Sequence, residues 1–319
     1  MASHVGCRVR GFEHTLTRPT PLAGGGADHD VGEAVSTTNM TGRTRTHDVT
    51  LDEVVERLGS SPHVRGVIVT GSGAHGPLHA ASDIDAYVLL DEPVASLFLV
   101  FTYVEHLPAE FYFDTFAYIE ELAGRAEPIP MLTIEAAKLR WLLTGRIVFD
   151  RDGRLRELQE IVSSGERILP PTEDERYSLW FGINYNLRQT RRMLLSSDPA
   201  YQTGVDLRLL YMLSEVWTGY FTVRGQAARG EKDQARYMAE RDPAYLSLFE
   251  KCLAEQDRTQ RLDLYERLAA RTLEPIGELW LNDSTGAQTL NSMGPESMHE
   301  ALEAWESLVA RPSEAESDV

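Results

Sequence analysis

Short runs of β-branched and aromatic residues alternate with brief amphipathic stretches in the half of the chain that follows residue 49. The runs have the length and composition of strands and predict them over 67–70, 83–90, 111–118 and 147–149. The amphipathic stretches predict helices over 51–58, 134–143 and 155–162. Residues 94–106 fit a helix or a strand, and we predict a helix. The pattern as a whole predicts an α/β (α+β) domain with a small mixed sheet.

The spacing of apolar residues changes after Pro170 and Pro171. Apolar residues then recur every three or four positions, which predicts helices over 173–195, 205–223, 243–253, 258–279 and 299–309. Residues 205–223 are apolar on nearly all sides, so we expect them to form the central helix of a bundle.

These patterns divide the chain into four parts. Residues 1–48 show no sustained periodicity and predict a disordered extension, with Met40 as a second candidate for the natural start. Residues 49–168 form the predicted α/β domain, residues 169–310 the helical domain, and residues 311–319 an acidic tail.

The formal net charge of the 319 residues is −18, and residues 1–49 contribute nothing to it. Such a surface repels a phosphate backbone and disfavours a nucleic-acid partner, whereas a small or cationic ligand suits it. The alternative is that the charge simply keeps the protein soluble. No apolar stretch reaches the roughly 18 residues that span a bilayer, and the N-terminus lacks the apolar core of a signal peptide. We therefore expect a cytoplasmic protein with no membrane partner.

Candidate chemistry is concentrated in one stretch, where Gly71-Ser72 follows a predicted strand and Asp83-Ile84-Asp85 opens the next. Gly71 allows close approach of a ligand to the backbone, and free N–H groups with the Ser72 hydroxyl are suited to phosphate oxygens. Asp83 and Asp85 lie two residues apart on a strand, so their side chains point to the same face. Mg²⁺ takes one or two carboxylates together with substrate phosphates. The stretch therefore predicts phosphoryl or nucleotidyl transfer, against the alternative of surface acids on an edge strand.

This stretch resembles the signature of the DNA polymerase β-like nucleotidyltransferase superfamily: Gly-Ser, a gap of about ten residues, and Asp-hydrophobic-Asp, here with Ser82 before the pair. The resemblance covers residues 67–118 and implies a third acid on a neighbouring strand. Asp114 is the best match, although Thr115 departs from a strictly hydrophobic flank and Glu110 lies on the same face of that strand.

The resemblance also implies site roles. Asp83, Asp85 and Asp114 are the expected ligands of two Mg²⁺ ions. Gly71, Ser72, Ser82 and, from the helical half, Lys232 are the expected nucleotide contacts. For Lys232 and Ser72 the alternatives are a solvated lysine and an ordinary turn residue.

By its arrangement of domains the chain looks like small-molecule nucleotidyltransferases of the aminoglycoside type. The implied reaction moves an NMP from an NTP to a hydroxyl of a small acceptor and releases pyrophosphate. Asp206 and Glu215, on otherwise apolar helices, are candidates to bind a cationic acceptor, or else they pair with arginines such as Arg208. Two alternatives remain open: a toxin-like enzyme that modifies a protein or tRNA, and a non-catalytic nucleotide-binding protein.

Overall fold

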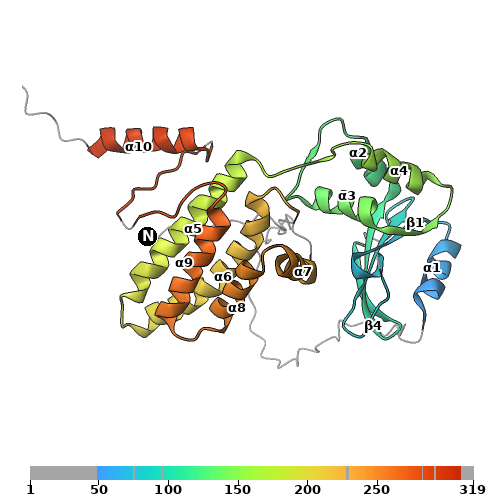
Figure 1. Ribbon diagram of the computed structural model, residues 1–319. Helices are drawn as coiled ribbons and strands as arrows, with labels where there is room; N and C mark the ends of the chain where they lie inside the picture. The colour runs from blue at the N-terminus through green and yellow to red at the C-terminus, as the bar shows by residue number, and fades with distance from the viewer. Residues whose placement is uncertain are drawn as a thin grey trace, which may run out of the picture. The chain divides into compact units, whose positions relative to one another are not determined.

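The computed structural model describes residues 49–74, 76–94, 96–227, 230–281, 283–290 and 292–309. These residues form two compact units (Figure 1). The first unit runs to Pro128 and from Thr133 to Arg167, and the second contains Ile129–Leu132 and the chain from Ile168 onward. The predicted extension over residues 1–48 and the predicted tail over 311–319 lie outside the described residues.

The first unit is built on a five-stranded sheet with the order β3-β4-β2-β1-β6. Strands β2 and β4 are parallel, whereas the other neighbouring pairs are antiparallel, so the sheet is mixed. The predicted fold class, a small mixed sheet followed by a helical region, is confirmed. The strands are β1 Val64–Thr70, β2 Ile84–Leu90, β3 Leu99–Val104, β4 Leu107–Thr115 and β6 Arg146–Asp150.

The two faces of the sheet differ in chemistry. One face is a continuous apolar core that includes Val67, Ile84 and Phe111 and packs against helix α1, Leu51–Ser60. The opposite face is polar at the end where β2 begins and buries Ile68 and Leu89 further along, and Trp141 of helix α3, Ile134–Thr144, packs against its tyrosines. Ile84 is buried in the apolar core. Because side chains alternate along a strand, the residues next to Ile84 point to this second face.

Residues 94–106 do not form the predicted helix. Their central part is β3, an edge strand paired with β4. The apolar run of β3 is short and half-buried, so its sequence fits a helix or a strand. Hydrogen bonding to β4 stabilises the strand. The strand predicted over 111–118 is β4, which begins earlier, at Leu107, and ends at Thr115. The Thr115 hydroxyl accepts the Tyr118 N–H and begins helix α2, Phe116–Gly124, where the sequence pattern predicts the end of a strand.

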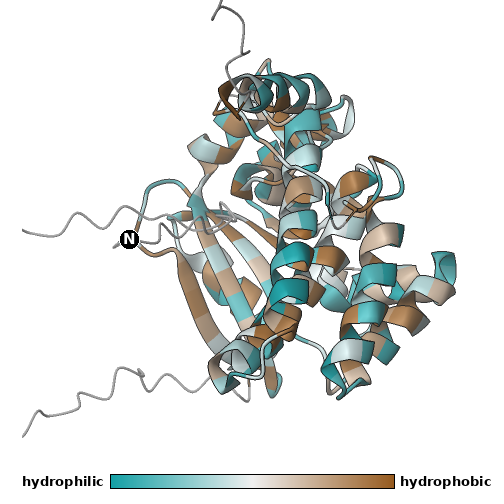
Figure 2. Cartoon of the chain, turned by 90° about the vertical axis from the view of Figure 1, so that its left-hand side faces the viewer, coloured by the Kyte–Doolittle hydropathy of each residue, from teal (hydrophilic) through white to brown (hydrophobic). Residues whose placement is uncertain are grey.

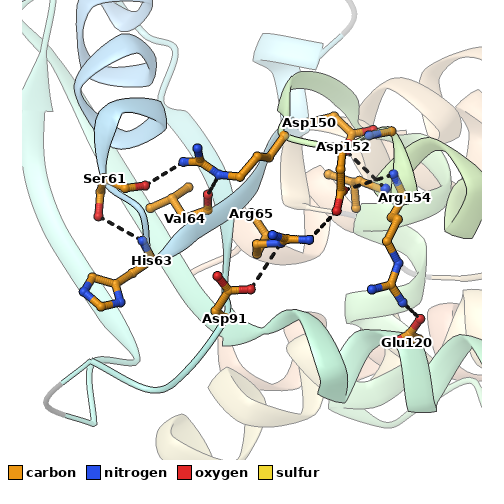
Figure 3. Close-up of polar contacts among 12 residues, drawn as sticks. Ser61, His63, Val64, Arg65, Asp91, Glu120, Asp150, Asp152 and Arg154 are labelled. Atoms are coloured by element: carbon orange, nitrogen blue, oxygen red, sulfur yellow. Dashed lines mark hydrogen bonds and ion pairs between the residues drawn. The ribbon is translucent and has the colours of Figure 1, made fainter.

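A polar network holds β6 beside β1 (Figure 3). Arg65 of β1 forms ion pairs with Asp91 and Asp152, and Asp152 lies in the turn after β6. The Asp150 carboxylate accepts the N–H groups of Gly153, Leu155 and Arg156 and so caps helix α4, Arg154–Ser163. The network therefore fixes β6 at one edge of the sheet, and β3 is the strand at the opposite edge.

The second unit is a helical bundle with a parallel two-stranded ladder of β5 and β7. Its core is formed by helices α5, α6, α8 and α9 around residues such as Leu209, Met212 and Tyr265. The helices carry both hydrophobic and hydrophilic residues on their surfaces (Figure 2). The elements are β5 Ile129–Pro130, β7 Ile168–Leu169, α5 Glu173–Leu194, α6 Pro199–Val223, α7 Glu231–Arg241, α8 Pro243–Ala254, α9 Arg258–Leu273 and α10 Pro295–Val309.

Two helices of the bundle differ from the prediction. Helix α6 starts at Pro199 rather than at residue 205, because Asp198 accepts the Ala200 N–H and proline is favoured in the first turn. Helix α7 was missed because it is mostly polar and buries only Gln234 and Met238. None of the helices in the described part of the chain combines the length and apolar composition that a membrane crossing requires.

Candidate active site

The two acids of the Asp-Ile-Asp motif lie where the polar face of the sheet begins. Asp83 directly precedes β2, and Asp85 is the second residue of that strand. Ile84 between them is fully buried in the apolar core on the other side. Alternation therefore places both aspartates on the polar face, with Cα atoms roughly 7 Å apart. Both remain partly exposed, as ligand-binding side chains must be.

Gly71 lies directly against the Asp85 carboxylate. The register pairs Thr70, the last residue of β1, with Asp85, so the turn that follows β1 borders the motif. A Cβ atom at Gly71 would lie 2.5 Å from Asp85 Oδ2, and the φ of Gly71 is +58°, in the left-handed region that favours glycine. Ser72 follows in the same 3₁₀ turn, Gly71–Ala74, and is exposed. The structure thus brings Gly71 and Asp85 together, as the sequence predicts.

Ser82 has a different environment from the predicted nucleotide contact. Its side chain is buried, its hydroxyl accepts the His79 N–H at 3.1 Å, and its own N–H donates to the His79 carbonyl at 2.7 Å. These bonds close the loop that delivers Asp83 to the start of β2. Ser82 therefore shapes the site.

Lys232, the other predicted nucleotide contact outside the turn, lies in the helical unit. It occupies the first turn of α7 rather than a loop, and it is exposed. Its contact with a triphosphate stays a prediction.

Asp114 is not placed beside the motif. The parallel register pairs it with Leu89, four residues along β2 from Asp85, which corresponds to roughly 13 Å. Its carboxylate Oδ2 lies 2.7 Å from Lys138 Nζ and accepts the Tyr87 hydroxyl at 2.7 Å. Lys138 is buried and also lies over the Tyr118 ring, 4.6 Å from the centroid. The structure therefore assigns Asp114 to an ion pair beneath α3, which corrects its predicted placement with Asp83 and Asp85.

Glu110 occupies the position predicted for Asp114. It is the direct partner of Asp85 in the β2–β4 register and therefore shares its face. The Tyr112 hydroxyl donates a hydrogen bond to Glu110 Oε2 at 3.0 Å. Burial, the hydrogen bond to Glu110 and the nearby charges of Glu110 and Asp85 raise the pKa of Tyr112 to about 12. This hydroxyl thus keeps its proton at neutral pH and stays a donor to Glu110.

The carboxylates of this site suit a hard cation without forming a complete protein cage. Among the described residues, no group of three or more histidines, cysteines, aspartates or glutamates is arranged to hold a metal. Asp85 nevertheless lies against the turn at Gly71, and Asp83 directly precedes the same strand. Mg²⁺ binds through one or two carboxylates and completes its shell with water and substrate phosphates. Two aspartates beside Gly71 fit that mode of binding.

The two acids proposed for a cationic acceptor have partners within the helical unit. Asp206 accepts two hydrogen bonds from Arg258, at 2.8 and 2.6 Å, and this pairing lowers its pKa. Glu215 accepts a bond from Asn186 at 3.0 Å, and burial raises its pKa. The arginine that pairs with Asp206 is thus Arg258 and not Arg208, and a role of either acid in binding an acceptor stays a prediction.

No family model matches the sequence, and no curated protein matches it. Among solved structures, the chain is similar to a nucleotidyltransferase-like protein from Exiguobacterium sibiricum 255-15. The identity is 15% and the TM-score 0.36, with 80% of this chain and 88% of that chain covered. The function of this chain is therefore inferred from its own residues.

Proposed function

We propose that this protein is a Mg²⁺-dependent nucleotidyltransferase that moves an NMP from an NTP to a hydroxyl of a small-molecule acceptor and releases pyrophosphate. The observation that supports it most directly is the contact between Gly71 and the Asp85 carboxylate. A turn suited to phosphate oxygens and a carboxylate suited to a hard cation lie side by side. Asp83, on the same face, supplies a second carboxylate.

Each residue of the site has one task in this reaction. Asp83 and Asp85 hold Mg²⁺, which when bound neutralises negative charge on the phosphate oxygens. The turn of Gly71 and Ser72 orients the β- and γ-phosphates through its N–H groups and hydroxyl. Glu110, which neighbours Asp85, accepts the proton of the acceptor hydroxyl, and Tyr112 orients the Glu110 carboxylate. Positioning and electrostatics of this kind supply most of the acceleration in such transfers.

The chemical step balances with these groups. The acceptor oxygen forms a bond to the α-phosphorus as the bond from that phosphorus to the bridging oxygen breaks. The bonding electrons leave with pyrophosphate, and the hydroxyl proton passes to Glu110. The mechanism requires an in-line arrangement, in which the attacking and leaving oxygens lie on opposite sides of the phosphorus.

The first test is pyrophosphate release from each NTP with a panel of metabolites, followed by mass spectrometry for an added NMP. We expect release only with Mg²⁺ present, together with an acceptor whose mass rises by one NMP. Calcium in place of magnesium serves as a control, because its longer bonds and irregular shell suit this chemistry poorly. NTP binding without pyrophosphate release from any acceptor would point to a non-catalytic nucleotide-binding protein, and an NMP found on protein or tRNA would exclude the small acceptor.

Replacing Gly71 with alanine is expected to lower transfer by about a hundredfold, since displacing a reacting group by an ångström has that order of effect. The new methyl group would lie 2.5 Å from Asp85 Oδ2 and would push the carboxylate out of place. The left-handed φ adds a cost of about 1–2 kcal/mol to folding. Initial rates of pyrophosphate release and thermal unfolding measure the two effects.

The matched control for this variant lies in the same loop. A Cβ atom at Gly76 meets nothing within 4 Å, so Gly76→Ala should keep both rate and stability. A Gly71→Ala enzyme that transfers at the wild-type rate would show that the close approach of Gly71 to Asp85 has no part in the reaction.

A further inference from the structure

A row of paired residues crosses the sheet at the level of the motif. Thr70 of β1 pairs with Asp85 of β2, Asp85 with Glu110 of β4, and Glu110 with Phe101 of β3. Paired residues of neighbouring strands point to the same face. The row therefore runs from the Gly71 turn, over the carboxylates, to an aromatic ring on the edge strand. With strands about 4.8 Å apart, Phe101 lies roughly 10 Å from Asp85.

The aromatic end of the row is exposed. Phe101 has 70% of its surface accessible, and Tyr103, two residues further along the same face of β3, has 47%. Val100 and Val104 point to the other face and pack into its apolar core, which confirms the direction of Phe101. Core packing thus explains the valines of β3, whereas the ring of Phe101 is mostly exposed. Clustered exposed apolar side chains at one place mark binding surfaces.

The in-line requirement indicates which ligand lies at this end. If the Gly71 turn holds the departing pyrophosphate, the leaving oxygen lies on the β1 side of the α-phosphorus. The attacking oxygen must then approach from the opposite side, over β4 and β3. Glu110 and Phe101 are the residues of the row on that side. The reacting hydroxyl of the acceptor therefore lies next to Glu110, and the rest of the acceptor contacts Phe101.

We propose that Phe101 and Tyr103 form the acceptor subsite and that the acceptor carries an aromatic ring a few bonds from its reacting hydroxyl. This inference rests on the proposed nucleotidyl transfer. A ring packed on Phe101 gains apolar contact and an edge or offset interaction between rings. The separation of roughly 10 Å between Phe101 and Asp85 leaves room for a short linker between ring and hydroxyl.

The test uses an NTP labelled at the α-phosphorus with two matched pairs of probes, phenylalaninol with alaninol and phenylpropanol with propanol. Each pair differs only in the phenyl ring. We expect kcat/KM for the phenyl member to exceed that of its partner by about tenfold or more. Phe101→Ala should raise KM for the phenyl probes by about tenfold while KM for the NTP stays unchanged. Ile161→Ala, on α4 and also exposed, is the control and should change neither constant.

Distinct outcomes overturn the subsite and the proposed function. No Mg²⁺-dependent NTP binding and no pyrophosphate release in the wild type would remove the function, and the subsite with it. Normal NTP binding with no preference for the phenyl probes, including transfer to neither member of a pair, overturns the subsite alone. A Phe101→Ala enzyme whose NTP affinity falls instead would assign the ring to the nucleobase. A change in oligomeric state with unchanged acceptor KM, seen by light scattering, would assign β3 to a contact between copies.

Discussion

Replacing Asp85 with asparagine is expected to lower nucleotidyl transfer by roughly a thousandfold or more, an effect of about 4 kcal/mol on the barrier. The amide has the shape of the carboxylate but loses the charge that a hard cation requires. Stability should stay within about 1 kcal/mol of wild type, because Asp85 is partly exposed and its removal eases repulsion from Asp83. Initial rates of pyrophosphate release measure the loss of transfer, and urea unfolding measures the change in stability. Asp83→Asn should show the same loss of transfer and the same small change in stability.

A surface aspartate elsewhere in the same unit controls for the general loss of charge. Asp52 lies exposed in the first turn of α1, the helix that packs on the opposite face of the sheet. Asp52→Asn should keep the full rate and lose only a few tenths of a kcal/mol at the helix N-terminus. Activity retained in both Asp83→Asn and Asp85→Asn would exclude the proposed metal ligands.

The sequence predicts the aspartate pair and the Gly71 turn because local rules govern both. Alternation along a strand assigns Asp83 and Asp85 to one face whatever lies beside it. A glycine after a β-branched run predicts a turn with close backbone approach, and the structure has one there. Neither inference needs to know which strands are neighbours.

The identity of the third acid, in contrast, depends on register between strands far apart in sequence. Glu110 and Asp114 lie on the same face of β4, four residues apart, and local periodicity cannot distinguish them. Only the parallel pairing with β2 sets Glu110 opposite Asp85 and Asp114 opposite Leu89. The helix predicted over 94–106 is wrong for the same reason, since β3 becomes a strand through pairing with β4. Lys138 gave no local signal, because its partner is 24 residues away in the sequence.

Replacing Lys138 with methionine is expected to lower the free energy of unfolding by about 3–5 kcal/mol. Lys138 and Asp114 have side chains only 10% and 19% exposed, and their charged atoms lie 2.7 Å apart. Methionine fills similar volume but leaves the carboxylate of Asp114 in an apolar site, with the Tyr87 hydroxyl still donating to it. Urea unfolding measures the loss.

The double variant Lys138→Met with Asp114→Leu separates an ion pair from a metal ligand. Replacing both charges with apolar groups removes the uncompensated carboxylate, so stability should recover most of what the single change loses. The same double variant should keep substantial transfer activity, because Asp83, Asp85 and Glu110 are untouched and Asp114 lies roughly 13 Å along the sheet from Asp85. If Asp114→Asn instead abolished transfer without loss of stability, Asp114 would be a member of the catalytic site after all, and β4 would have to shift by four residues to bring it there.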